Sequence, residues 1–465
     1  MNRYKILAQN TALVSLGNFG AKLLIFLMVR FYTEWLSPSE YGTADLLTQT
    51  VNLLLPLATL GVSDAVFRFA IDRQGARARI FTIGFWTVTV GSIALFLMML
   101  CARAFLPVAS AYLPLVCAFT AASGYHALCA QFLRGEGKTA LFATQGVVNT
   151  ALMVGLSVWF LAGLELGVAG YVWAFTLANL LTTMGLICKE RLWRLVVRHP
   201  GKRLAAQMFR YSLPLVPAAM FWWIMNTSDR YMITAFLGTE ANGLYTVAGK
   251  LPTILTICAG MFMDAWQLSA VREAEGERAA HLAFYARVWR VFMAGMFLAG
   301  AILIAFAPLL VLILADEDYA EAWRFVPFLV LAMVFAAFSN YLGSVYIVAR
   351  KSSLSFSTSL LGAVMNVLLN LWLIPSPLGA QGAALATCAS CAVVFFVRLW
   401  NTRRYLPFDL SGGTLAGGLL LLGAQASAML LRGPLWQLVQ GVVLLVLVVW
   451  AYKPLIQTLA VLRQK

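Results

Sequence analysis

The chain has 465 residues, of which 61% are apolar and only 11% are charged, and its mean hydropathy is +0.82. A soluble protein of this length carries a charged exterior, so the composition excludes a soluble enzyme and a soluble binding module. The apolar stretches are too long for barrel strands, and they predict an all-α polytopic membrane protein. Basic loops facing anionic lipid account for the net charge of +15, and we expect no nucleic-acid partner.

The first apolar stretch, at 9–31, carries a polar stripe. Its polar residues follow a 4-3-4 spacing and share one helix face: Thr11, Ser15, Asn18 and Lys22. Hydrogen bonding between helices would explain the hydroxyl and amide groups of such a stripe. A lysine inside a membrane is tolerated where it faces protein or water, so Lys22 favours a wet cavity.

The second apolar stretch, at 44–67, repeats this pattern. One helical stripe contains Asp45, Gln49, Asn52, Pro56, Thr59 and Ser63. We therefore expect the first two spans to border the same cavity.

Fourteen transmembrane spans are predicted along the chain. They lie at roughly 9–31, 44–67, 80–101, 108–132, 140–162, 166–188, 209–236, 242–268, 284–314, 323–348, 354–374, 379–399, 411–431 and 435–456. The charged linker at 189–208 is predicted to form a surface helix. Pro214 and Pro217 are expected to bend the seventh span near its start, where a hinge would serve a rocking motion.

Most of the 34 lysines and arginines occur in alternate loops, with Arg398 counted in the loop that ends at Arg404. The intervening loops carry acidic residues, such as Glu34, Glu165 and Asp316. The positive-inside rule then places both termini in the cytoplasm.

The sequence repeats itself internally. Leu36 to Gly42 matches Leu237 to Gly243 in spacing, and LGVAG at 166–170 matches LGAQG at 378–382. Six spans in each repeat predict two lobes of like orientation, related by a pseudo-twofold axis along the membrane normal. The expected organisation is an N-lobe at 1–200, a C-lobe at 201–405, and two further helices with a cytoplasmic tail at 406–465.

Several of these stretches resemble a known family. The opening SLGNFGAKLLIFLMVRFYTEWLSPSEYGTADLL, with Leu36, Tyr41 and Gly42 in its loop, and the helix ending in Gly61, Arg68 and Phe69 are similar to bacterial polysaccharide flippases. These proteins form the polysaccharide transporter branch of the multidrug/oligosaccharidyl-lipid/polysaccharide (MOP) exporter superfamily. The LGxxGAAxAT run at 378–387 is similar to the same family.

This resemblance implies a transporter and not an enzyme. The implied activity is transfer of an undecaprenyl-diphosphate-linked oligosaccharide from the cytoplasmic to the periplasmic leaflet by alternating access, for O-antigen, exopolysaccharide or capsule synthesis. It also implies a bacterial inner-membrane location, contact with membrane lipid, a coupling ion (H⁺ or Na⁺), and polysaccharide assembly proteins as partners. No cofactor is expected.

Charges and amides within the spans are the candidate site residues. The cations expected to bind the diphosphate are Lys22, Lys250, Arg30 and Arg230. The amides expected to face sugar are Asn18, Gln49, Asn52, Gln145, Asn149, Asn226, Asn366 and Asn370, with Trp222 and Trp223 as candidates for stacking on sugar rings. The acids available for ion coupling are Asp45, Asp64, Asp229 and Asp264.

Three other functions remain open at this stage. A multidrug or cation antiporter of the same superfamily would be expected to carry acids, not lysines, at the centre of its cavity. A peptidoglycan-precursor or teichoic-acid flippase fits the same pattern. A membrane polysaccharide polymerase would need a catalytic outer loop, and the short acidic run at 315–321 is the only candidate for one. The scattered His and Cys residues predict no metal site and no catalytic triad.

Overall fold

The structure, a computed structural model, describes residues 24, 26–72, 76–103, 112–273, 278–348, 351–431 and 435–463. Lys22, Asn18 and most of the first predicted span lie outside these residues. The chain divides into two compact units, Met1–Thr227 and Ser228–Lys465, which are described separately below.

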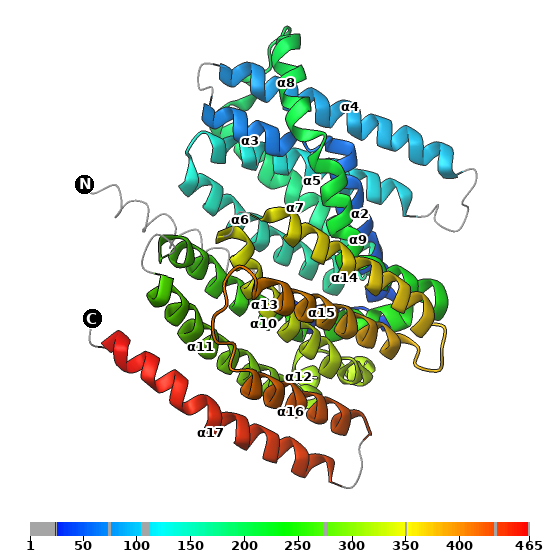
Figure 1. Ribbon diagram of the computed structural model, residues 1–465. Coiled ribbons are helices and arrows are strands. Elements are labelled where there is room, and N and C mark those ends of the chain that lie inside the picture. The colour runs from blue at the N-terminus through cyan, green and yellow to red at the C-terminus, as the bar shows by residue number, and fades with distance from the viewer. Residues whose placement is uncertain are drawn as a thin grey trace. The chain divides into compact units, whose positions relative to one another are not determined.

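The described secondary structure is helical throughout (Figure 1). Residues 26–35 are helical and precede α2. The first unit then contains α2 (Pro38–Thr59), α3 (Val62–Asp72), α4 (Arg77–Arg103), α5 (Leu113–Gly135), α6 (Thr139–Ser157), a π-helical turn η3 (Val158–Gly163), α7 (Gly167–Glu190), η4 (Leu192–Leu195) and α8 (Lys202–Ser212). Helix α9 (Leu215–Leu237) contains the boundary between the units.

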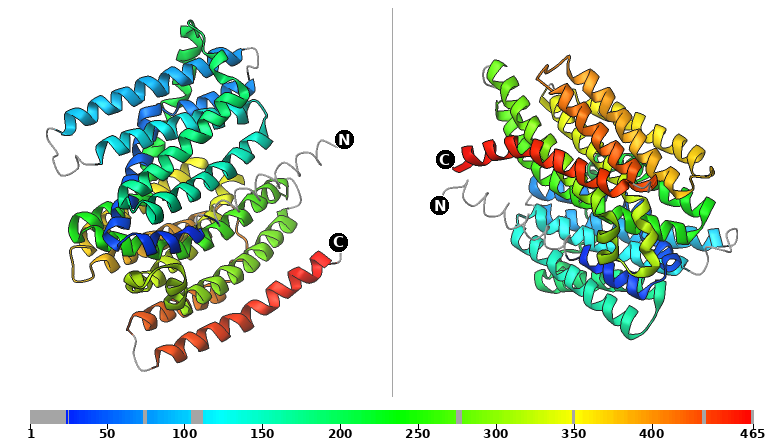
Figure 2. Two further views of the ribbon diagram at one scale, coloured as in Figure 1. Left: turned by 180° about the vertical axis from the view of Figure 1, so that it is seen from behind. Right: turned by 90° about the horizontal axis from the view of Figure 1, so that it is seen from below.

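The second unit continues with α10 (Thr239–Glu273), α11 (Arg278–Ala305), α12 (Ala307–Leu314), η5 (Glu317–Arg324), α13 (Val326–Val348), α14 (Ser352–Leu373), α15 (Ala380–Thr402), α16 (Gly412–Leu431) and α17 (Trp436–Arg463). Helices α11, α16 and α17 pack side by side in this unit (Figures 1 and 2).

The protein is an all-α multi-pass membrane protein. Among the described residues, ten helices are long and apolar enough to cross a membrane, or eleven if the bent pair α2 and α3 forms one span. This is fewer than the fourteen spans that the sequence predicts. Most of the first predicted span lies outside the described residues. The helices α9 and α17 occupy the seventh and fourteenth predicted spans but are not among these ten.

Two predicted spans are broken. The span predicted at 44–67 bends by 56° between α2 and α3, where Leu60 (φ 49°) and Gly61 (φ 64°) both adopt left-handed backbone. The span predicted at 284–314 breaks at Phe306, because Pro308 in the first turn of α12 has no N–H to continue the hydrogen-bond ladder of α11. The helix is also interrupted near Pro214, where the sequence predicts a bend, because α8 ends at Ser212 and α9 starts at Leu215.

The predicted surface helix of the linker corresponds to α8, which is amphipathic. Its Leu204 and Met208 are buried against α3, α4 and α5, while Lys202 and Arg203 are exposed. Burial of this apolar face anchors the linker to the first unit.

Helix α13 is the most deeply buried candidate span of the second unit, and aromatic side chains surround it. Phe338 and Tyr341 of α13 contact Trp289 of α11, with ring centroids 5.1 Å apart in each pair. The Trp289 indole N–H donates to the Leu410 carbonyl at 3.0 Å, so the buried ring leaves no unpaired donor.

Candidate functional site

Helix α2 carries a ladder of polar side chains in the first unit. Its start is fixed by a capping box, in which the Ser37 hydroxyl accepts from the Glu40 N–H and the Glu40 carboxylate accepts from the Ser37 N–H. Further along the helix, Gln49 Nε2 donates to Asp45 Oδ1 at 3.4 Å and Asn52 Nδ2 donates to Gln49 Oε1 at 3.3 Å. The predicted stripe is therefore a connected set of side chains.

The ladder runs from a buried end to an accessible end. Asp45 is only 7% exposed, Gln49 is half-buried and Asn52 is exposed. Trp223 of α9 packs onto it, donating its indole N–H to the Gln49 carbonyl at 2.9 Å. Trp222, by contrast, is 68% exposed. The ladder thus offers an acceptor and donors to a polar ligand at its Asn52 end.

The bend between α2 and α3 interrupts the predicted polar stripe. Ser63 and Asp64 lie beyond the bend at Leu60, on α3. The Asp64 side chain is exposed, and the Ser63 hydroxyl is buried without a hydrogen-bond partner among the described residues. The bend therefore separates Asp64 from the Asp45 ladder.

The remaining amides of the first unit join α5, α6 and α7. Gln145 of α6 is buried and hydrogen-bonds His126 of α5 at 2.7 Å. Asn149 donates to Asn179 of α7 at 2.9 Å, and Asn179 donates to Ser123 of α5 at 3.1 Å. These side chains link three helices within the first unit.

In the second unit, Asp229 binds a buried tyrosine. The Tyr245 hydroxyl of α10 donates to Asp229 Oδ2 at 2.9 Å, and the backbone N–H of Arg230 donates to Asp229 Oδ1 at the same distance. Thr387 of α15 is a further hydrogen-bond partner of the Tyr245 side chain. Through Tyr245, Asp229 is connected to α15.

The amides Asn366 and Asn370 of α14 extend this network. Asn366 Nδ2 lies within hydrogen-bond distance of Thr387 Oγ1 (3.2 Å) and Ser390 Oγ (3.3 Å) of α15. Asn370 donates to Asn366 Oδ1 at 3.0 Å and is fully buried. The structure thus brings three predicted residues, Asp229, Asn366 and Asn370, into one connected group.

Of the four cations predicted to bind the diphosphate, the structure describes three, since Lys22 lies outside the described residues. Within their own units, Arg30, Arg230 and Lys250 are each partly buried. Asn226 is exposed and donates to the Trp222 carbonyl of its own helix at 2.7 Å. Of Asp264, only the helical backbone lies within the described residues.

The prediction that Arg398 belongs to the loop cations is wrong. This residue lies inside α15 and is only 4% exposed. Its guanidinium donates to the Ser339 carbonyl (2.8 Å), the Ser355 carbonyl (3.2 Å), the Thr358 hydroxyl (3.0 Å) and the Ser359 hydroxyl (2.9 Å). The apolar run AVVFFVRLW around it, continuous with the predicted span, is the sequence signal that distinguishes it from a loop residue.

A charge network joins four helix ends in the first unit. Glu136, at the end of α5, pairs with Arg77 of α4 and with Lys138, which also pairs with Glu190 of α7. Burial raises the pKa of Glu136 above its ordinary value of 4.5, although Arg77 and Lys138 oppose this shift. The network fixes one end of the helix bundle of this unit.

Within the described part of the chain, no group of three or more His, Cys, Asp or Glu residues is arranged to hold a metal ion. Polar recognition in the described residues thus rests on amides, hydroxyls and a few charged groups.

Solved structures of transporters share this fold. An inward-facing MATE-family multidrug resistance transporter of the MOP superfamily aligns with a TM-score of 0.68 at 16% identity, covering 83% of this chain and 94% of that one. The lipid II flippase MurJ in an inward closed conformation aligns with a TM-score of 0.66 at 12% identity, covering 97% of this chain and 100% of that one. A MOP superfamily transporter from Pyrococcus furiosus aligns with a TM-score of 0.59 at 15% identity, covering 86% and 95%.

These likenesses establish a MOP-type fold. A comparison with curated proteins finds no match. The family model described as "Polysaccharide biosynthesis protein" matches residues 7–266, which is more than half of the chain. The chain therefore belongs to the polysaccharide biosynthesis protein family.

Proposed function

We propose that the protein is a flippase that moves an undecaprenyl-diphosphate-linked oligosaccharide from the cytoplasmic to the periplasmic leaflet, for synthesis of a surface polysaccharide. The observation that carries this proposal is the family match over residues 7–266. The MOP-type fold supports it, because that fold also serves the lipid II flippase MurJ. Location in a bacterial inner membrane with cytoplasmic termini, and contact with polysaccharide assembly proteins, belong to the same proposal.

The proposed architecture is the one that the sequence repeat predicts. It has fourteen spans, in an N-lobe at 1–200, a C-lobe at 201–405 and two further helices at 406–465. In alternating access the two lobes rock around a central site, so the polar head group crosses the membrane without entering hydrocarbon.

A diphosphate loses its hydration on entering such a site, and fixed cations must replace that water. We assign this role to Lys22, Lys250, Arg30 and Arg230. The in-membrane lysines favour an anionic substrate over a cationic one, because positive charges inside a membrane attract anions and repel cations.

We propose that sugar is contacted first by Gln49, Asn52 and Asn226, which are at least partly accessible. By contrast, Gln145, Asn366 and Asn370 are buried and bonded to neighbouring helices. We propose that these amides, with Asn149, fix the helices that carry the site, and that Asn18 continues the stripe of the first span.

The proposed coupling to H⁺ or Na⁺ uses a carboxylate among Asp45, Asp64, Asp229 and Asp264. Asp45 and Asp229 are the best-supported candidates, because each is tied by hydrogen bonds to groups that a change in its charge would disturb.

Multidrug export is the second candidate function. It is favoured by the structural similarity to the inward-facing MATE-family transporter. We place it second because the spans of this chain carry Lys22 and Lys250, whereas a transporter of cationic drugs needs acidic groups at its centre.

A deletion strain of the bacterium that encodes the protein separates these functions. For the flippase, we expect loss of surface polysaccharide, build-up of the lipid-linked oligosaccharide on the cytoplasmic side, unchanged drug resistance, and recovery with the wild-type gene. Normal polysaccharide with increased drug accumulation would refute the proposal and support an antiporter. Build-up of a peptidoglycan or teichoic-acid precursor instead would assign the substrate to that class.

A further inference from the structure

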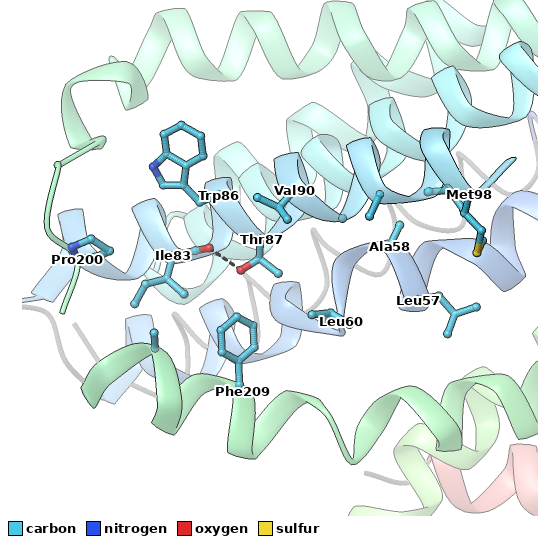
Figure 3. A pocket seen from close by; sticks show the side chains of 14 residues that line it. Leu57, Ala58, Leu60, Ile83, Trp86, Thr87, Val90, Met98, Pro200 and Phe209 are labelled. Carbon is cyan, nitrogen blue, oxygen red and sulfur yellow. Dashed lines mark hydrogen bonds between the residues drawn. The ribbon is translucent and has the colours of Figure 1, made fainter. Parts of the chain in front are cut away.

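A long groove opens on the side of the first unit, with a volume of about 640 Å³. Its walls come from α2, α4, α8 and the linker before α8, as Figure 3 shows for Leu57, Trp86 and Phe209. The residues of α4 that line it extend from Ile83 to Met98. At 1.5 Å per residue this stretch is about 22 Å long, compared with about 30 Å for the hydrocarbon core of a bilayer.

Small residues make the groove deep. Ala58 of α2 and Gly91 of α4 cross so closely that a Cβ atom on Gly91 would lie 1.7 Å from the Ala58 carbonyl oxygen. Ala94 continues this floor along α4. The larger side chains of Leu57, Trp86 and other lining residues rise around it.

The lining is suited to hydrocarbon. Thr87 carries the only hydroxyl among the lining residues, and it donates to the Ile83 carbonyl of its own helix at 2.7 Å (Figure 3). Trp86, Val90 and Met98 are each more than half exposed. The groove is therefore open along its length, and an occupant enters it sideways from the bilayer.

One end of the groove is basic. Pro200 and Ala205 line this end, and the adjacent Arg198, Lys202 and Arg203 are all exposed. By the positive-inside rule this end faces the cytoplasm, where the leaflet carries anionic lipid. An apolar channel that ends at a cluster of cations complements a lipid with an acyl chain and a phosphate head group.

We propose that this groove binds one acyl chain of an anionic phospholipid, with its phosphate held by Arg198, Lys202 and Arg203. The choice of a phospholipid over the polyprenyl tail of the substrate rests on two observations. None of the described residues assigned above to the diphosphate or the sugar lines the groove. Lateral access also exposes the groove to whichever anionic lipid is most concentrated in the bilayer, which mass action then favours.

The test uses the full-length protein, purified in mild detergent and titrated with lipid under native mass spectrometry. The probes are phosphatidylglycerol, phosphatidylcholine with the same acyl chains, and undecaprenyl phosphate. We expect saturable binding of phosphatidylglycerol to one site, at least about tenfold tighter than that of phosphatidylcholine.

Two pairs of variants locate the site. Ala94→Phe fills the groove and is expected to abolish the tight binding, whereas Ile93→Phe, a neighbouring exposed position outside the lining, keeps it. The triple change R198Q/K202Q/R203Q is expected to weaken binding by roughly tenfold or more. The control removes three exposed cations of the second unit, K351Q/R403Q/R404Q, and leaves binding unchanged.

Three outcomes would overturn the proposal. The first is equal binding of phosphatidylglycerol and phosphatidylcholine, which would mean a non-selective lipid annulus. The second is full phosphatidylglycerol binding by a folded Ala94→Phe protein with the wild-type melting temperature. The third is displacement of phosphatidylglycerol by undecaprenyl phosphate at equal concentration, which would assign the groove to the polyprenyl tail.

Discussion

Replacing Arg398 by methionine tests whether its buried guanidinium holds the second unit together. The side chain joins α15 to α13 through the Ser339 carbonyl, and to α14 through the Ser355 carbonyl and two hydroxyls. Methionine keeps most of the length of the side chain but has no donor.

The cost follows from these hydrogen bonds. A hydrogen bond to a charged group contributes about 1.5–3 kcal/mol, which bounds the gross loss for four bonds at roughly 6–12 kcal/mol. The net loss of stability is smaller than this sum for two reasons. The Thr358 hydroxyl keeps its own hydrogen bond to the Leu354 carbonyl, at 2.8 Å, when the guanidinium is absent. Removing the buried cation also removes the free-energy cost of its desolvation. We expect a net loss of about 2–5 kcal/mol, the equivalent of one or two bonds.

The assay is thermal unfolding of the purified protein in detergent, followed by tryptophan fluorescence. For a cooperative unit of the size of Ser228–Lys465, the expected decrease in melting temperature is roughly 5–15 °C. Arg398→Lys should fall between methionine and wild type, since an ammonium lacks the planar fork that reaches both helices. Arg403→Met, at an exposed cation of the same helix end, is the control. An Arg398→Met protein that melts within about a degree of wild type would refute the stabilising role.

Three further changes test other parts of the structure. Gly91→Ala should lower the melting temperature by an amount equivalent to about 1–3 kcal/mol, because its Cβ meets the Ala58 carbonyl, whereas Gly155→Ala, with open space around it, should not. Burial raises the pKa of Glu136, so the folded protein holds that proton more tightly than the unfolded chain. Stability should therefore fall as the pH rises above 4.5, and a melting series on Glu136→Gln should lose this slope. Asn366→Leu leaves the side-chain amide of the fully buried Asn370 without its acceptor and should cost about 1–3 kcal/mol by the same melting assay, with an unchanged melting temperature contradicting the network.

Hydropathy and periodicity are sufficient to predict the fold class, and the resemblance of short runs such as LGxxGAAxAT at 378–387 to polysaccharide transporters indicates the family. The α2 stripe was also predictable, because a 4-3-4 spacing fixes which side chains share a helix face. The breaks were harder to predict. The bend after α2 depends on left-handed backbone at Leu60, a residue that rarely adopts it, and the following Gly61 is the one local signal for it.

The partners of the polar residues could not be predicted from one sequence. His126 looks isolated along the chain, yet Gln145 lies beside it once α5 and α6 pack. In the sequence Tyr245 resembles any buried aromatic residue. In the structure its hydroxyl donates a hydrogen bond to Asp229. Such contacts depend on helix packing, which spacing within a single helix does not determine.

Surface-glycan export by lysine variants tests the central proposal that Lys22 and Lys250 bind the substrate diphosphate. Lys22→Ala and Lys250→Ala are each expected to abolish surface polysaccharide while the amount of protein in the membrane stays at the wild-type level. Lys250→Arg is expected to restore part of the export, because it retains the positive charge. Normal polysaccharide in both alanine variants would contradict the account.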